Sequence, residues 1–156
     1  MMNFFEPKKP DVYTIIVGCG RLGANLANTL SDAGRNVLIM DQTGDSFRRL
    51  SSSFGGLSVV GDGTDFDTLQ KADIDKASVV VAVTNNDNTN IMVAQIARDV
   101  FHVEHVIARL YDPERECVYR EFDIDTICPA VLSAKEIDKF LGNLGHKGPT
   151  AKEMLT

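Results

Sequence analysis

The sequence has no long apolar run and few residues of the kinds that build disulfide frameworks or metal centres. No stretch approaches the roughly 18 consecutive apolar residues of a membrane-spanning helix, so none is expected. The three cysteines, Cys19, Cys117 and Cys128, are odd in number, widely spaced and in no CxxC pair, which argues against disulfides and a zinc site. We therefore expect reduced thiols in a cytoplasmic protein.

Positive charge is also scarce. The 156 residues include 16 lysines and arginines against 22 aspartates and glutamates, which gives a formal net charge of −6. Binding nucleic acid through its phosphates requires a basic face, so no nucleic-acid partner is expected. The opening residues, MMNFFEPKKPD, lack the apolar centre of a signal peptide, and no secretory signal is expected.

The sequence does contain short apolar runs that alternate with segments of helical apolar spacing. Six runs rich in Val and Ile are predicted as strands buried on both faces: 12–17, 36–40, 57–60, 78–83, 105–108 and 124–128. Helices are predicted between them, around 22–30, 47–50 and 69–72, over 91–100, from Pro113 onward and over 130–141. The alternation predicts an α/β fold: a Rossmann-like, doubly wound, six-stranded parallel sheet with helices on both faces.

The length fits one domain. We predict a nucleotide-binding Rossmann domain over residues 12–142. Residues 1–11 and 143–156 are predicted to be flexible ends, because they contain few apolar residues and, at the C-terminal end, several glycines.

A glycine-rich segment with the pattern GxGxxG follows the first predicted strand and opens a predicted helix. Gly18 would allow a tight turn, Gly20 would let a pyrophosphate approach the backbone, and Gly23 would let the helix pack on the strand. The free amides at the helix N-terminus would face the phosphates. A turn without a ligand is the alternative. The candidate binding residues are Gly18, Cys19, Gly20, Arg21, Leu22 and Gly23.

An acidic residue closes the second predicted strand. Asp41 stands 18 residues after Gly23, close to the spacing of about 20 at which an acid accepts hydrogen bonds from ribose hydroxyls and repels the 2′-phosphate of NADP. Gln42 follows it and is included in the candidate site. A surface or helix-capping aspartate is the alternative.

Polar residues also follow the third, fourth and fifth predicted strands, whose carboxyl ends meet at the ligand crevice of a parallel sheet. These candidates are Gly61, Asp62, Gly63 and Thr64, then Thr84 and Asn85, which open the segment 84–87 expected to line the crevice, and finally Arg109. Asx-turn and capping roles are the alternative for the first two groups, with Thr64 as an N-cap. A surface salt bridge is the alternative for Arg109 and for Arg21.

Together, these segments resemble the RCK N-terminal domain, also called TrkA-N or KTN, which is the nucleotide-binding subunit of Trk and Ktr potassium uptake systems. The resemblance rests on IIVGCGRLG, GDGTD, VAVTNNDNTN followed by IAR, VIARLYDP and ICPAVLSAKEI, in the family's order over residues 13–141. No single segment is specific, but the set is. Gly63 stands where the family often has alanine.

The resemblance implies that the crevice binds NAD(H) or an adenine nucleotide (ATP, ADP or AMP). It also implies self-association as a dimer or higher ring, with the helix over 130–141 as the interface element. The implied partner is a membrane-embedded potassium translocator, which would bring the protein to the inner face of the membrane. Many family members continue into a C-terminal regulatory domain, which a separate chain could supply here. The implied roles are phosphate binding by Gly18, Gly20, Arg21 and Gly23, ribose binding by Asp41, adenosine contact by Asp62 and Thr64, nucleotide contact by Thr84 and phosphate contact by Arg109.

The sequence offers little for catalysis. A dehydrogenase needs a substrate domain and an acid–base group near the nicotinamide. None of the three histidines, His102, His105 and His146, stands at the carboxyl end of a predicted strand, and there is no Tyr-x-x-x-Lys pair or Walker lysine. We therefore predict a regulatory subunit that binds a nucleotide and gates a translocator, not an enzyme. A small NAD-dependent oxidoreductase, or a subunit of one, is the alternative, as is an interaction domain without a nucleotide.

Overall fold

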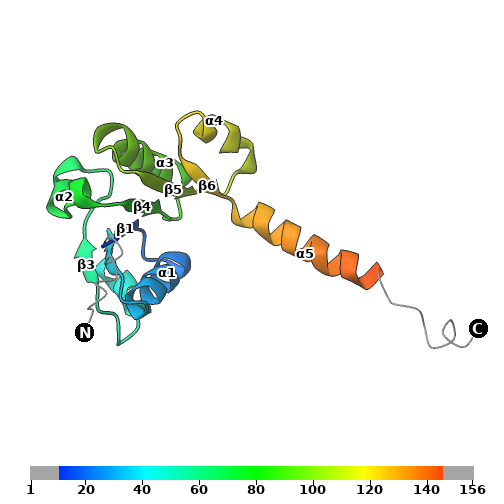
Figure 1. Cartoon of the computed structure of the whole chain (residues 1–156), viewed down its shortest axis with the longest axis horizontal. Coiled ribbons are helices and arrows are strands. Elements are labelled where there is room, and N and C mark those ends of the chain that lie inside the picture. Colours follow the sequence, from blue (N-terminus) through cyan, green and yellow to red (C-terminus); the bar gives the residue numbers. More distant parts are fainter. Residues whose placement is uncertain (1–10, 146–156) are drawn as a thin grey trace, which may run out of the picture.

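Six parallel strands form the central sheet of the computed structural model, which describes residues 11–145 (Figure 1). The strand order is β3-β2-β1-β4-β5-β6, so the order reverses between β1 and β4. This is the order of a Rossmann-type doubly wound sheet, and the fold prediction is confirmed. The strands are β1 Tyr13–Val17, β2 Asn36–Asp41, β3 Leu57–Val60, β4 Val79–Ala82, β5 His105–Arg109 and β6 Asp125–Ile127.

Helices cover the sheet on both faces because the strands are apolar on both faces. One core cluster packs β1, β2, β4 and β5 against α2 (Phe66–Lys71), α3 (Asp87–Gln95) and α4 (Glu116–Arg120). The other packs them against α1 (Arg21–Asp32) and the short helical turn η1 (Gly44–Arg49). Within β1, Ile15 and Val17 belong to the first cluster and Ile16 to the second, as the alternation of a strand requires. The helical elements are α1 Arg21–Asp32, η1 Gly44–Arg49, α2 Phe66–Lys71, η2 Ile74–Lys76, α3 Asp87–Gln95, η3 Ile96–Val100, η4 Pro113–Arg115, α4 Glu116–Arg120 and α5 Pro129–Gly145.

The fourth predicted helix starts earlier than its apolar pattern indicated. It was predicted over 91–100, whereas α3 begins at Asp87, because the side chain of Asn86 caps it by accepting a hydrogen bond from the Thr89 amide at 2.9 Å. From Ile96 onward the chain continues as the π-helical turn η3.

The proposed capping role of Thr64 is wrong. The N-cap of α2 is Asp65, whose carboxylate accepts from the amide of Thr68 at 3.0 Å and from its hydroxyl at 2.6 Å. Both residues are good capping types, so the sequence alone did not separate them.

The last helix, α5, points away from the sheet and stands clear of it (Figure 1). It runs through Gly145, three residues beyond the predicted domain boundary at Gly142, because its apolar residues keep their helical spacing past that glycine. Residues 1–10 and 146–156, on which most of the predicted flexible ends fall, lie outside the described residues. No helix within residues 11–145 has the length and apolar character needed to cross a bilayer.

Two glycines set the close contact between α1 and β1. Gly18 has a φ of +109°, a backbone conformation that residues with a side chain rarely adopt. A Cβ there would also lie 2.8 Å from the backbone of Val83 and Thr84, in the segment that follows β4. A Cβ on Gly23 would overlap the carbonyl oxygen of Gly18. The helix can therefore begin directly behind the strand only if both positions lack side chains.

Replacing Gly23 by alanine should therefore destabilise the fold. We expect the free energy of unfolding to fall by about 3 kcal/mol, because the added methyl meets backbone that cannot move aside. Urea denaturation followed by circular dichroism measures the change. Gly20→Ala is the matched control, since a Cβ at Gly20 meets nothing within 4 Å, and its effect should stay within about 1 kcal/mol. Equal losses in the two variants would contradict the packing argument.

Candidate functional site

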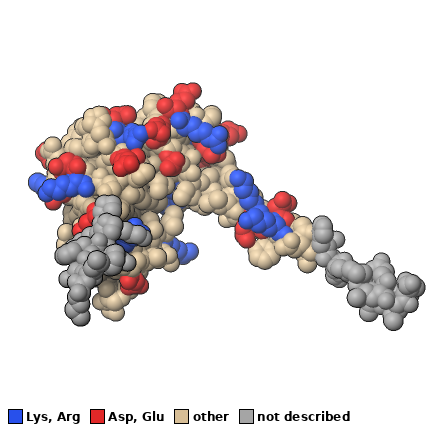
Figure 2. Space-filling view, viewed as in Figure 1, with Lys and Arg blue, Asp and Glu red and all other residues tan. Residues whose placement is uncertain are grey.

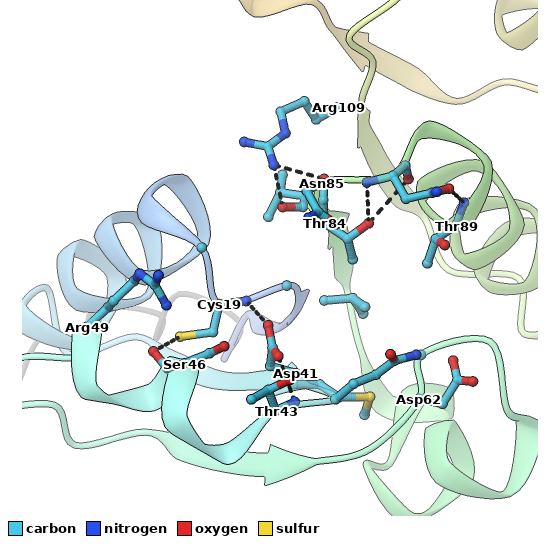
Figure 3. Close-up of a pocket in the computed structure, with 18 residues that line it drawn as sticks. Cys19, Asp41, Thr43, Ser46, Arg49, Asp62, Thr84, Asn85, Thr89 and Arg109 are labelled. Carbon is cyan, nitrogen blue, oxygen red and sulfur yellow. Dashed lines mark hydrogen bonds between the residues drawn. The ribbon is translucent and has the colours of Figure 1, made fainter.

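A cleft of about 450 Å³ opens at the carboxyl edge of the sheet (Figure 3). It lies where the strand order reverses, between the chain segments that leave β1 and β4. Connections on the two sides of such a point run to opposite faces of the sheet and leave a crevice between them. The size falls within the range of small-molecule sites.

The N-terminus of α1 forms one wall of this cleft. Gly20 is the N-cap, it has no side chain to cap the helix, and the first turn holds no acidic residue. The leading amides of a helix have no partner within the helix and carry partial positive charge. A Cβ on Gly20 would touch no protein atom and would stand in open space that belongs to the cleft. This wall is therefore suited to an anion such as a phosphate group.

Asp41 faces this wall from the end of β2 (Figure 3). Its Oδ2 accepts a hydrogen bond from the amide of Cys19 at 2.8 Å, and its Oδ1 accepts one from the amide of Thr43 at 2.8 Å. Two amides thus hold the carboxylate in place, and each oxygen retains capacity to accept a further bond. A fixed pair of acceptors beside a phosphate-binding wall fits the vicinal hydroxyls of a ribose.

Cys19 contributes its backbone and not a reactive thiol. Its side chain is fully buried and its Sγ donates to the carbonyl of Ser46 at 3.4 Å. Burial raises the pKa of the thiol, the charge of Asp41 raises it further, and Arg49 opposes these two effects. A thiol with a raised pKa stays protonated near neutral pH and is a poor nucleophile.

The loop after β3 brings Asp62 and Gly63 to the cleft. Asp62 Oδ1 accepts from both the amide and the hydroxyl of Thr64, at 2.8 and 2.7 Å. The bonds from Thr64 lower the pKa of the Asp62 carboxyl, which is therefore ionised at neutral pH. The Asx-turn alternative for this loop is thus confirmed, and the Thr64 hydroxyl is directed at Asp62. Gly63 is packed on Val17, whose Cγ1 would lie 2.5 Å from an added Cβ.

Arg109 reaches the opposite side of the cleft from the end of β5 (Figure 3). Its Nη2 donates to the carbonyls of Val83 and Thr84 at 2.9 and 2.8 Å, and the guanidinium lies 4.9 Å from the ring centroid of Tyr111. Its Nε is buried without a hydrogen-bond partner. The described residues form no salt bridge with it, so the salt-bridge alternative is wrong for this arginine, whose guanidinium is held by backbone carbonyls and an aromatic ring.

Ten of the predicted site residues come together at the cleft, from five separate segments of the chain. Five do not line it, for local reasons. Gly23 is packed against Gly18, Gly61 lies against the side chain of Thr68, and Thr64 is bonded to Asp62. Arg21 and Leu22 lie in the first turn of α1 with exposed side chains. The ten that line the cleft are Gly18, Cys19, Gly20, Asp41, Gln42, Asp62, Gly63, Thr84, Asn85 and Arg109.

Eight further residues line the cleft that were not among the individual candidates, although one of them, Asn86, lies in the segment 84–87 that was expected there. Some are the last apolar residues of strands, which end at the cleft for the same reason as the polar residues after them. Others lie in η1, where the sequence showed only a helical segment with Phe47 and Leu50 on one side. A search of every residue within a few positions of a strand's carboxyl end would have found most of them. The eight are Val17, Met40, Thr43, Ser46, Arg49, Val83, Asn86 and Thr89.

The sequence matches a known domain family and its curated members. The TrkA-N domain family matches residues 14–129. The "Trk system potassium uptake protein TrkA" of Streptomyces coelicolor is 44% identical over 126 residues, which are 81% of this chain and 56% of that protein. The chain thus spans little more than half the length of this curated relative.

Two solved structures show the same fold. The TrkA-N domain of the inner membrane protein ybaL from Escherichia coli superposes with a TM-score of 0.74 at 18% identity, covering 83% of this chain and 96% of that one. GsuK bound to ADP gives a TM-score of 0.69 at 27% identity, covering 86% of this chain and 34% of that one. The range that the TrkA-N family matches, residues 14–129, includes five of the six strands complete and all but the first residue of β1. It also includes every residue that lines the cleft. This chain therefore belongs to the TrkA-N domain family.

Proposed function

We propose that this protein binds an adenine nucleotide, either NAD(H) or one of ATP, ADP and AMP, and that binding regulates a membrane-embedded potassium translocator. The observation that carries the proposal is the uncapped N-terminus of α1 with the fixed carboxylate of Asp41 beside it. The ADP bound to GsuK and the potassium-uptake name of the Streptomyces relative support it. The protein would then lie in the cytoplasm, at the inner face of the membrane, through contact with its partner.

The proposed role is binding and not catalysis. The carboxylates of Asp41 and Asp62 are each held by backbone amides, and the thiol of Cys19 is buried and protonated. His102 and His105 stand before and at the start of β5, at the opposite edge of the sheet from the cleft, and His146 lies outside the described residues. Among the described residues, we find no histidine or reactive thiol at the cleft to act as a general acid or base, which disfavours the oxidoreductase alternative.

Replacing Gly20 by asparagine should separate folding from nucleotide binding. Asparagine is a preferred N-cap residue, so its side chain should satisfy the leading amides of α1 and raise the stability by roughly a few tenths of a kcal/mol. The same side chain would fill the space for a phosphate, and we expect affinity for AMP, ADP and NAD⁺ to fall by at least about tenfold. Thermal denaturation and isothermal titration calorimetry measure the two effects.

The opposite signs of these effects make the test strict. If the wild-type protein binds none of AMP, ADP, ATP and NAD⁺ in calorimetry, the proposed function is wrong. A Gly20→Asn protein that folds and keeps wild-type affinity would show that the nucleotide binds elsewhere. Gly44→Asn serves as a control, because Gly44 lies in η1 and does not line the cleft.

The ribose contact of Asp41 can be tested with a pair of ligands. We expect Asp41→Ala to weaken AMP binding by about 1–3 kcal/mol, the usual effect of losing a hydrogen bond and leaving its partners unpaired. The 2′,3′-dideoxy analogue of AMP lacks the hydroxyls, so its affinity should already be low in the wild type and change little in the variant. Calorimetry with both ligands and both proteins gives the coupling between Asp41 and the hydroxyls. Equal losses for the two ligands would show that Asp41 does not contact the ribose.

The α5 helix is the proposed surface of self-association. Ile137, Phe140, Leu141 and Leu144 are each more than half exposed and follow the i, i+3, i+4, i+7 spacing of a single apolar stripe. The helix stands clear of the body, with charged and uncharged side chains open to solvent (Figure 2). An apolar stripe of this kind is typical of a helix that packs against a second protein surface.

A charge on this stripe should break the association. In Phe140→Asp, an aspartate would have to be buried without a partner in the interface, so we expect monomers where the wild type forms dimers or larger rings. Multi-angle light scattering after gel filtration measures the mass. The thermal transition of the sheet domain should not move, and Lys135→Ala on the same helix should leave the mass unchanged. A wild-type protein that is monomeric at all concentrations would contradict this assignment of α5.

A further inference from the structure

Asn90 is a fully buried polar residue whose side chain bonds only to the ends of two strands. It lies in α3 at 0% exposure. Its Oδ1 accepts from the amide of Thr84 at 2.8 Å and from its hydroxyl at 2.6 Å. Its Nδ2 donates to the carbonyls of Thr84 and Arg109 at 3.0 and 2.9 Å. Both donors and both acceptor positions of the amide are therefore used.

These bonds continue the connection between β4 and β5 beyond the point where the strands themselves separate. The backbone pairing of the two strands ends at Ala82 and Ala108. Past that point, the amide of Asn90 joins Thr84 to Arg109 and takes the place of a further rung. Burying a side-chain amide is unfavourable unless all its hydrogen bonds are made. The fully bonded amide of Asn90 therefore fixes the two strand ends relative to each other.

Thr84 and Arg109 both line the cleft, whereas Asn90 does not. The guanidinium of Arg109 donates to the Thr84 carbonyl that also accepts from Asn90, so the three residues form one closed network. The network lies across the crevice from Asp41 and the end of β2, on the far side of the point where the strand order reverses. A dinucleotide spans that point, while a mononucleotide bound at the glycine loop and Asp41 remains on one side of it.

We propose that Asn90 is a positioning residue that holds Thr84 and Arg109 in place for the half of a dinucleotide that lies beyond its diphosphate. This inference rests on the proposed nucleotide site. It assigns no ligand contact to Asn90 itself. It predicts that loss of the Asn90 amide changes the preference between ligands, which a role in stability alone would not do.

The test compares NAD⁺ and AMP binding to the wild type and to Asn90→Ser by calorimetry. A serine hydroxyl is too short to join both strand ends, and it introduces no charge. We expect NAD⁺ affinity to fall by at least about tenfold while AMP affinity stays within about twofold. Val106→Ala is the matched control, since it opens a cavity near the amino end of β5 and lowers stability without touching the network. In the control, the ratio of the two affinities should not change.

A second variant covers the case in which Asn90→Ser does not fold. Asn90→Asp keeps the shape and the acceptor for Thr84 but loses the donor to both carbonyls, and it should shift the ratio in the same direction. Binding of both ligands with an unchanged ratio in the folded variant would overturn the inference and leave the proposed function intact. A wild-type protein that binds AMP but not NAD⁺ would also overturn it. A wild-type protein that binds no nucleotide would overturn both.

Discussion

The close contact between the start of α1 and the end of β1 is the constraint on which the rest of the site depends. Gly23 lies against the carbonyl of Gly18, so the helix begins directly behind the strand and its N-cap, Gly20, lies at the cleft. Any side chain at either position would push the helix and its N-cap away from the point where the strand order reverses. The same contact places the Cys19 amide against Asp41, which fixes the carboxylate beside the start of the helix.

The two sides of the crevice differ in how much of their hydrogen-bonding capacity is already used. On the side of β1 and β2, the leading amides of α1 can still donate hydrogen bonds to a ligand, and the carboxylate of Asp41 can still accept them. On the side of β4 and β5, Thr84, Asn90 and Arg109 bond mainly to one another and to backbone. A preorganised wall of this second kind favours ligands of one shape, because a misplaced group leaves buried partners unsatisfied.

A bound nucleotide can regulate a partner only if it binds one arrangement of the protein more tightly than another. The connection between the cleft and α5 is short. Leu110, next to the cleft residue Arg109, donates its amide to Ile127 in β6, and α5 starts two residues beyond that strand. The apolar stripe of α5 is thus carried on the same edge of the sheet as Arg109. In the proposed function, a nucleotide bound in the crevice would change the position of this edge, and a second subunit packed on α5 would respond to that change.

The sequence by itself determined the six strands, the glycine loop and Asp41, because apolar runs, turn glycines and strand-end polar residues leave local patterns. It also determined that the sheet is parallel, since helices separate the strands. Only the tertiary structure decided that β1 pairs with β4 and which strand-end residues reach the crevice, because these depend on contacts between distant segments. The role of Asn90 was hidden for the same reason: a buried asparagine and a capping asparagine look alike until the partners Thr84 and Arg109 are in place. The tertiary structure also decided that α5 leaves the sheet. Its apolar spacing fits a helix packed on the core of its own domain and a helix packed on another subunit equally well.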